Sequence, residues 1–268
     1  MKQVFKFEFK HQMKAVLFWI MGMGCIQWIM MSVYPVFSEN TSIQEEILAN
    51  YPEELLRAFN MSHDLPLSSV AGYMVFTFTF VQLCFSIQSA YLGFSILSKE
   101  ERAMTADFLL AKPVSRSQIF FGKLVASLLS FIITVLAVMG ITLVTIEAYR
   151  GQATYDLSHF IILFAGMFFF MCLLFTIGLL ASVFMRKVKN VLSLALALSL
   201  GTYVLNAVRT VVGGDLLGLF TPFFYFDIGY ILKEGQLKTG LSLLALGMIL
   251  TGLLLVYRQY DKRNIQSL

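Results

Sequence analysis

Long apolar stretches separated by short polar segments are the dominant pattern of this chain. An apolar run of about 20 residues crosses the ~30 Å hydrocarbon core of a bilayer as an α-helix. Such a helix satisfies its own backbone hydrogen bonds, and the alternating pattern of a membrane barrel is absent. The pattern predicts an all-α integral membrane protein with six transmembrane helices in a single domain, residues 1–268. The six runs are 15–37, 70–97, 124–146, 160–185, 191–212 and 239–257.

The segment before the first run has a helical period of its own. Phe5 and Phe9 form an apolar stripe beside a basic stripe with a four-residue repeat. This pattern predicts an N-terminal amphipathic interfacial helix in the headgroup region, and a plain basic anchor for the first span is the alternative. The basic stripe consists of Lys2, Lys6, Lys10 and Lys14.

Two connections carry further structure. Residues 213–238, before the last span, are apolar and aromatic but interrupted by glycine and proline, which predicts short re-entrant or interfacial helices. In residues 98–123, Thr105 is a candidate N-cap for a short amphipathic helix that Pro113 ends, and Ser115 opens the helix leading into the third span. A short amphipathic helix can dock into a partner groove, and a loop that merely reverses the chain is the alternative.

Composition strengthens the membrane assignment. Apolar residues make up 58% of the chain and charged residues 13%, about half the charge content of a soluble domain. Too little polar surface is available to cover a water-facing globule, so a soluble enzyme is disfavoured. The cysteines, Cys25, Cys84 and Cys172, lie far apart in apolar runs and suggest neither zinc nor disulfides.

The distribution of charge predicts the orientation. Fifteen of the 20 lysines and arginines fall in the N-terminus, the second-to-third and fourth-to-fifth connections and the C-terminal tail. Basic residues favour the cytoplasmic side, so both termini are expected there, with three acidic loops outside. We expect a multi-pass protein of the bacterial cytoplasmic membrane.

Several segments resemble ABC-2-type transporter permeases. Residues 99–116, followed by Gly122-Lys123, resemble the inner loop of that family, with its Leu-Leu and Pro-Val-Ser-Arg elements. Residues 221–227, 257–265 and 51–59 resemble further elements in the family's order. The departures are Met104 in place of the usual glycine and Asn264 in place of aspartate.

The resemblance implies the partners and the mechanism. Such a permease pairs with a second six-span subunit, identical or related, and with two cytoplasmic ATPase subunits. The inner-loop helix, the coupling helix between spans 2 and 3, docks into an ATPase groove. The chain has no phosphate-binding P-loop motif, so ATP and Mg²⁺ are expected on the ATPase, with no cofactor bound here. The expected coupling residues are Glu100, Glu101, Arg102, Thr105, Asp107, Phe108, Leu109 and Arg116.

Polar residues within the spans suggest a substrate pathway. The second and fifth spans each carry four polar residues spaced 3, 4 and 3, which places each set on one helical face. The resemblance adds that these spans line the central cleft of the dimer, whereas hydrogen bonding between neighbouring helices is the simpler explanation. Arg209 has two further alternatives, reaching headgroups or pairing with Glu147 or Asp215. The candidate pathway residues are Gln82, Ser86, Thr202, Asn206 and Arg209.

Other chemistry is poorly supported. His63-Asp64 and Asp156 with His159 are too few residues for a metal site, and no catalytic motif or nucleic-acid partner is indicated. The expected function is therefore an ATP-driven exporter permease, not catalytic by itself. Its acidic outer face and aromatic spans suggest hydrophobic or cationic cargo, such as a peptide, antimicrobial or drug. The alternative is a non-transporting interaction, immunity or signalling subunit.

Overall fold

The computed structural model describes residues 2–40, 65–99, 115–185 and 188–262, together with residues 50, 52 and 56. Within these ranges every regular element is a helix, and six helices are long and apolar enough to cross a membrane. The six are α1 (Lys2–Glu39), α4 (Val70–Ile96), α7 (Arg116–Tyr149), α8 (Leu157–Phe184), α9 (Val191–Val212) and α13 (Thr239–Lys262). The predicted all-α membrane fold is confirmed.

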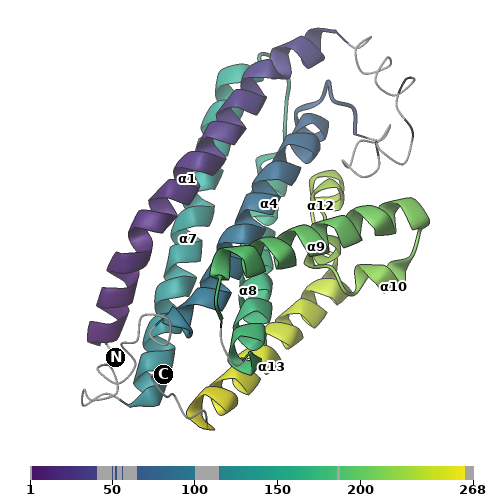
Figure 1. Ribbon diagram of the computed structural model, residues 1–268. Helices are drawn as coiled ribbons and strands as arrows, with labels where there is room; N and C mark the ends of the chain where they lie inside the picture. The colour runs from purple at the N-terminus through teal and green to yellow at the C-terminus, as the bar shows by residue number, and fades with distance from the viewer. Residues whose placement is uncertain are drawn as a thin grey trace.

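Helix α1 differs from the prediction in its N-terminal part. A separate interfacial helix was expected before a span that begins at residue 15, but one helix runs from Lys2 to Glu39 without a break. Glu8, Gln12 and Val16 are spaced four residues apart and are buried on one face, and α1 lies alongside α7 (Figure 1). Because this face is continuous across residue 15, packing on α7 extends the helix past the predicted boundary.

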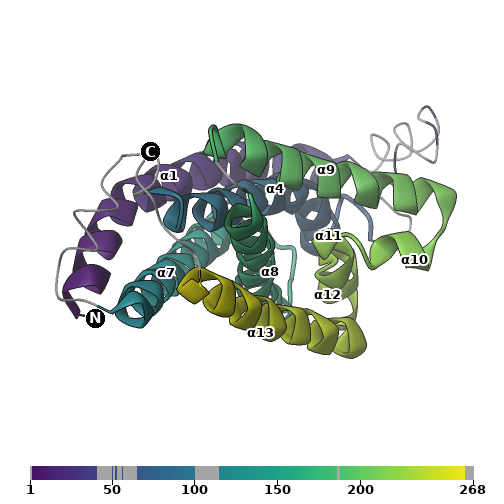
Figure 2. The ribbon, with the colours of Figure 1, turned by 60° about the horizontal axis from the view of Figure 1, so that its bottom comes forward.

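Helix α8 lies at the centre of the bundle. It contacts α4, α7, α12 and α13, which surround it when the molecule is viewed toward its lower end (Figure 2). The α4–α8 crossing is close because glycines meet there: a Cβ on Gly93 would lie 2.5 Å from the carbonyl oxygen of Phe175, and Gly178 faces Gly93 across the contact. Small residues at such crossings let the backbones of membrane helices approach.

Helices α9 and α13 lie on the outside. Only a narrow stripe of α9, formed by Val191, Ala195 and Ser199, is buried, and the opposite side exposes Leu200 and Val204. Packing of α9 on α4 holds it against the bundle. These exposed apolar side chains are suited to lipid or to another membrane subunit.

Three short helices connect α9 to α13, as the sequence predicted. They are α10 (Asp215–Gly218), α11 (Pro222–Tyr225) and α12 (Ile228–Glu234). Gly213 ends α9 and Gly235 ends α12 in left-handed conformations, at φ of 73° and 63°, which glycine adopts without strain. Asp227 caps α12 by accepting a hydrogen bond from the backbone of Tyr230. Residues 213–238, which we call the aromatic segment, thus pack on α4, α8 and α9 instead of forming another span.

Several helix ends meet at one end of the bundle, which we call the basal end. The start of α1, the end of α4, the start of α7 and the end of α13 lie there (Figure 1). Helix α1 therefore starts, and helix α13 ends, at the basal end, as an even number of spans requires.

Candidate functional site

Most of the predicted coupling residues lie outside the described residues. Glu100, Glu101, Arg102, Thr105, Asp107, Phe108 and Leu109 belong to this group, whereas Arg116 is described. The described chain stops at Lys99 and resumes at Ser115. The site is therefore built from the two ends of the connection 100–114 and from what each end contacts.

The start of the connection is fixed by a buried group of charges, Glu8, Lys99 and Lys123, which we call the basal cluster. The two carboxylate oxygens of Glu8 each lie 3.6 Å from a lysine ammonium, Oε1 from Lys123 and Oε2 from Lys99. The side chains of Glu8 and Lys123 are only 5% and 2% exposed. Charges this deeply buried are tolerated only when paired, so the cluster ties α1 and α7 to the segment that follows α4.

Lys123 has a second role in the cluster. Its ammonium donates a hydrogen bond to the carbonyl of Ile96, the last residue of α4. The last carbonyls of a helix have no partner within the helix, and a cation at this end is also favoured by the helix dipole. Lys123 therefore caps α4 and neutralises Glu8 at the same time.

The far end of the connection is fixed to α13. The Ser115 side chain accepts a hydrogen bond from the backbone of Gln118 and caps α7, as the sequence predicted. Arg116 then donates to the carbonyl oxygens of Tyr260 and Asp261, at 3.4 and 3.0 Å. These carbonyls belong to the last turns of α13, another cation at a helix C-terminus.

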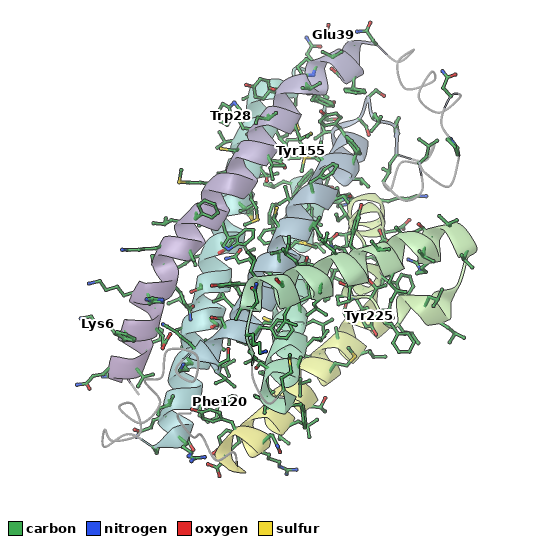
Figure 3. All side chains as sticks on the ribbon, viewed as in Figure 1. Lys6, Trp28, Glu39, Phe120, Tyr155 and Tyr225 are labelled. Carbon is green, nitrogen blue, oxygen red and sulfur yellow. The ribbon has the colours of Figure 1, made fainter. Side chains whose placement is uncertain are left out.

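Aromatic packing strengthens the α7–α13 contact. The Phe120 ring lies 5.5 Å from the ring of Tyr257 and 6.1 Å from that of Tyr260, and the Tyr257 hydroxyl bonds to Ser117 at 2.9 Å (Figure 3 labels Phe120 at the basal end). The residue before the connection 100–114 thus contacts α1, and a residue soon after it contacts the end of α13.

The predicted pathway residues of α4 lie inside the subunit. Gln82 is 3% exposed, and its side-chain amide donates to the carbonyl of Phe226 at 2.9 Å. Ser86 is fully buried and donates to the carbonyl of Leu83 in its own helix. Gln82 therefore joins α4 to the aromatic segment before α12.

The predicted pathway residues of α9 are more accessible. Thr202 bonds back to Leu198, and its carbonyl accepts a 2.9 Å hydrogen bond from Thr221. Asn206 and Arg209 are half-buried and lie 3.4 Å apart at their polar atoms. Because Gln82 bonds to Phe226 and Thr202 to Thr221, the segment between α9 and α12 is bonded to both helices.

Arg209 lies against an aromatic ring. Its guanidinium carbon is 3.8 Å from the centre of the Phe224 ring, and the Lys238 ammonium is 4.4 Å from the same centre. Glu147, a predicted partner of Arg209, bonds instead to Arg150 and Tyr155. Lys238 is also paired with a carboxylate, that of Asp227, at 3.2 Å.

A polar chain that the sequence analysis missed crosses the middle of the bundle. Ser130 donates to the Gln12 side chain at 2.9 Å, and Gln88 donates to Thr134 at 2.9 Å, which links α1, α7 and α4. The signal available in the sequence was a glutamine within an apolar helix, at position 88, because an amide there requires a partner.

Metal chemistry has no support in the described part of the chain. No group of three or more His, Cys, Asp or Glu residues is positioned to hold an ion there. His159 bonds to the carbonyl of Leu232 at 2.9 Å and packs against Gly235, a structural role.

Comparisons with known proteins give one match. A scan against protein-family models matches residues 3–229 to the family described as ABC-2 family transporter protein. The match covers α1 to the start of α12 and therefore includes the basal cluster and both polar stripes. No curated protein and no solved structure matched the chain.

Proposed function

The chain belongs to the ABC-2 transporter family, and from this premise we propose that it is the permease subunit of an ATP-driven exporter. The observation that carries the proposal is the family match over most of a chain with six membrane-length helices. Two cytoplasmic ATPase subunits hydrolyse ATP with Mg²⁺, and a second permease, identical or related, completes the complex. This chain moves substrate and is not catalytic.

The two anchored ends of the connection 100–114 support a coupling role. A docked helix in this connection is pushed by the ATPase, and its ends bear on the basal cluster and on Arg116. Both attachments use cations at helix C-termini. Lys123 donates to the last carbonyl of α4, and Arg116 donates to two carbonyls of α13. Closure of the ATPases is thereby converted into movement of α1, α4, α7 and α13.

The exposed side of α9 supports the placement of the second permease and of the pathway. Gly201 faces open space, and Val204 and Val208 are exposed beside it. A second subunit packed here places the half-buried Asn206 and Arg209 near the edge of the contact, within reach of a cleft between subunits. The apolar and aromatic surroundings favour hydrophobic or cationic cargo, such as a peptide or drug.

The test is co-expression of this chain with its cognate ATPase, followed by ATPase and substrate-flux measurements in proteoliposomes. We expect the ATPase to co-purify, and we expect Arg116→Gln to lose most of the permease-dependent ATPase stimulation while the complex still assembles. The matched control is Arg258→Gln, an exposed arginine near the end of α13, the helix end that Arg116 binds. Full stimulation in Arg116→Gln would refute the coupling role.

The same preparation distinguishes the alternative function. A non-transporting interaction or immunity subunit binds the ATPase but gives no flux for any hydrophobic or cationic substrate. Flux that requires both ATP and this chain supports the exporter. ATPase binding without flux supports the alternative.

Orientation is tested by cysteine labelling. In a background without Cys25, Cys84 and Cys172, a cysteine at Glu234 should react with an impermeant reagent added to intact cells, and one at Lys6 should not. Both positions are exposed in the described chain. The opposite labelling pattern would reverse the proposed cytoplasmic placement of the termini.

A further inference from the structure

Four of the long helices form two closely packed pairs. Helix α1 packs mainly on α7, and α4 packs mainly on α8 and then on α9 (Figure 1). A Cβ on Gly24 of α1 would lie 2.9 Å from the Ile141 side chain of α7. Gly93 and Gly178 meet where α4 crosses α8. The surface where α4 faces α1 and α7, which we call the seam, joins the two pairs.

The seam is less completely packed than the contacts within each pair. A cavity of about 180 Å³ lies between α1 and α4 toward the basal end, with Gln12 and Ala15 of α1 and Leu92 of α4 in its lining. Close-packed helix contacts leave few gaps larger than a water molecule. The seam therefore leaves room for a small displacement of α4 against α1.

Three polar atoms along the seam have no hydrogen-bond partner within the part of the chain that the structure describes. They are the amide oxygens of Gln27 on α1 and Gln88 on α4 and the hydroxyl of Thr142 on α7, and each is inaccessible to solvent. The parallel helices α1 and α7 pair residues 115 positions apart, as in Gln12 with Ser127, so Thr142 lies at the level of Gln27. An unpaired polar group inside a membrane protein is costly and requires a physical explanation.

The sulfur of Met74 on α4 binds two polar groups of the seam weakly. The Gln27 side-chain nitrogen donates to this sulfur at 3.2 Å, and the Thr77 hydroxyl donates to it at 3.8 Å. All three side chains are fully buried. A thioether sulfur is a weak acceptor, whereas an amide oxygen is a good one. Because both donors share one sulfur, the Thr77 hydroxyl lies close to the Gln27 amide, whose oxygen is unpaired in the described chain.

We propose that the seam is a shear plane with two hydrogen-bond arrangements. In the first, which the structure shows, Gln27 and Thr77 both bond to the Met74 sulfur. In the second, α1 and α7 move together along α4 by about 1–2 Å, a displacement typical of packed helices, and the Thr77 hydroxyl donates to the Gln27 amide oxygen. This exchange replaces a weak bond to sulfur by a bond between oxygens. The lysines of the basal cluster have long flexible side chains that follow such a displacement.

The use of the two arrangements rests on the proposed transport function, whereas their existence does not. The connection 100–114 follows α4 and precedes α7, so its two ends belong to opposite sides of the seam. A force on this connection acts between α4 and the α1–α7 pair. Closure of the ATPases thereby favours one arrangement over the other, as a ligand does when it interacts differently with two states.

The existence of two arrangements is tested by NMR of the free, full-length protein in lipid nanodiscs, with carbon-13 in the methionine methyl groups. We expect the Met74 methyl, assigned through Met74→Leu, to give two signals or exchange broadening, because its sulfur loses a donor in one arrangement. Thr77→Val removes the donor of the second arrangement and should leave a single Met74 signal. Met167 and Met171, fully buried on α8, are internal controls and should give single signals. A single, unbroadened Met74 signal in the wild type would overturn the proposal, as would two signals that persist in Thr77→Val.

Transport measurements test the use of the seam in complexes with the ATPase. Gln27→Leu removes the acceptor of the second arrangement, and we expect flux per folded complex to fall about five-fold, the factor for one hydrogen bond of ordinary net strength. Thermal stability should be unchanged or raised, because an unpaired buried amide oxygen is removed. The matched control, Met23→Leu, lies one turn earlier on the same buried face of α1 and should change neither quantity.

The possible results separate the seam from the exporter. Unchanged flux in Gln27→Leu would refute the use of the seam in transport, and a joint loss of stability and flux would assign Gln27 a packing role and refute it as well. Absence of flux in the wild type would refute the exporter and leave the NMR result standing.

Discussion

Replacement of Lys123 by methionine is the most direct test of the basal cluster. Methionine keeps an unbranched side chain and removes the charge. The change eliminates the ion pair with Glu8 at 3.6 Å and the hydrogen bond to the carbonyl of Ile96. Removing one partner of a buried ion pair costs about 3–5 kcal/mol, because the other charge remains buried. Glu8 retains Lys99, so we expect the lower end of this range, a loss of about 3 kcal/mol in the free energy of unfolding.

A double-mutant cycle with Glu8→Gln isolates the pairwise interaction. The double variant removes both charged groups of the pair, so neither Glu8 nor Lys123 is left buried without the other. We expect the double variant to lose about 1–2 kcal/mol less than the sum of the two single losses. The assay is denaturant titration of the protein in lipid nanodiscs, with the exposed Arg258→Met as the control. Single losses that add to within about 0.5 kcal/mol would show that Glu8 and Lys123 do not interact energetically, which refutes the cluster as a tie between α1 and α7.

Three further predictions concern packing, the polar stripes and pH. Gly93→Ala should lower the free energy of unfolding by about 1–3 kcal/mol, because the added Cβ would meet a backbone carbonyl of α8. Gly247 faces open space, so Gly247→Ala should leave stability unchanged, and thermal unfolding of both variants checks this. Gln82→Leu should lower stability by about 1 kcal/mol through the lost interhelical bond, whereas Asn206→Leu should change flux per folded complex more than stability. Hydrogen bonds from Ser158 lower the pKa of Asp156 below its ordinary value of 3.8. The stability that this N-cap contributes is therefore present above pH 3.8 and is lost as the pH falls through the lowered pKa. Hydrogen-exchange protection of the first α8 amides should fall in that pH range in the wild type and should show no such step in Asp156→Ala.

Much of the fold followed from local properties of the chain. The fifth span was predicted at residues 191–212, which is the extent of α9, and α4 and α13 begin at the predicted residues 70 and 239. Ser115 was a recognisable cap, and the glycines and proline of residues 213–238 predicted short helices. The first span was harder to delimit, because its basic N-terminal stripe matches an interfacial helix as well as the exposed side of a longer one.

The candidate site was only partly predictable, because it depends on contacts between residues far apart in the sequence. Arg116 was identified through a family motif, but its binding to the end of α13 requires contacts across more than 140 residues. Gln82 was identified as a polar residue on a helical face, and periodicity alone does not say whether that face meets a cleft or another segment of the same subunit. The bond from Gln82 to the carbonyl of Phe226 depends on how the aromatic segment folds back against α4.

The sequence by itself determined the number, order and approximate limits of the membrane helices, because the hydrocarbon thickness is a fixed length against which each apolar run is measured along the chain. Tertiary structure decided which polar groups meet. Glu8 looks in sequence like one more charge of an interfacial helix, and Lys123 like the first charge before a span. The packing of α1 on α7 buries both, and a buried charge persists only with a partner. The meeting of these two residues, 115 positions apart, therefore arises from the three-dimensional packing of the helices.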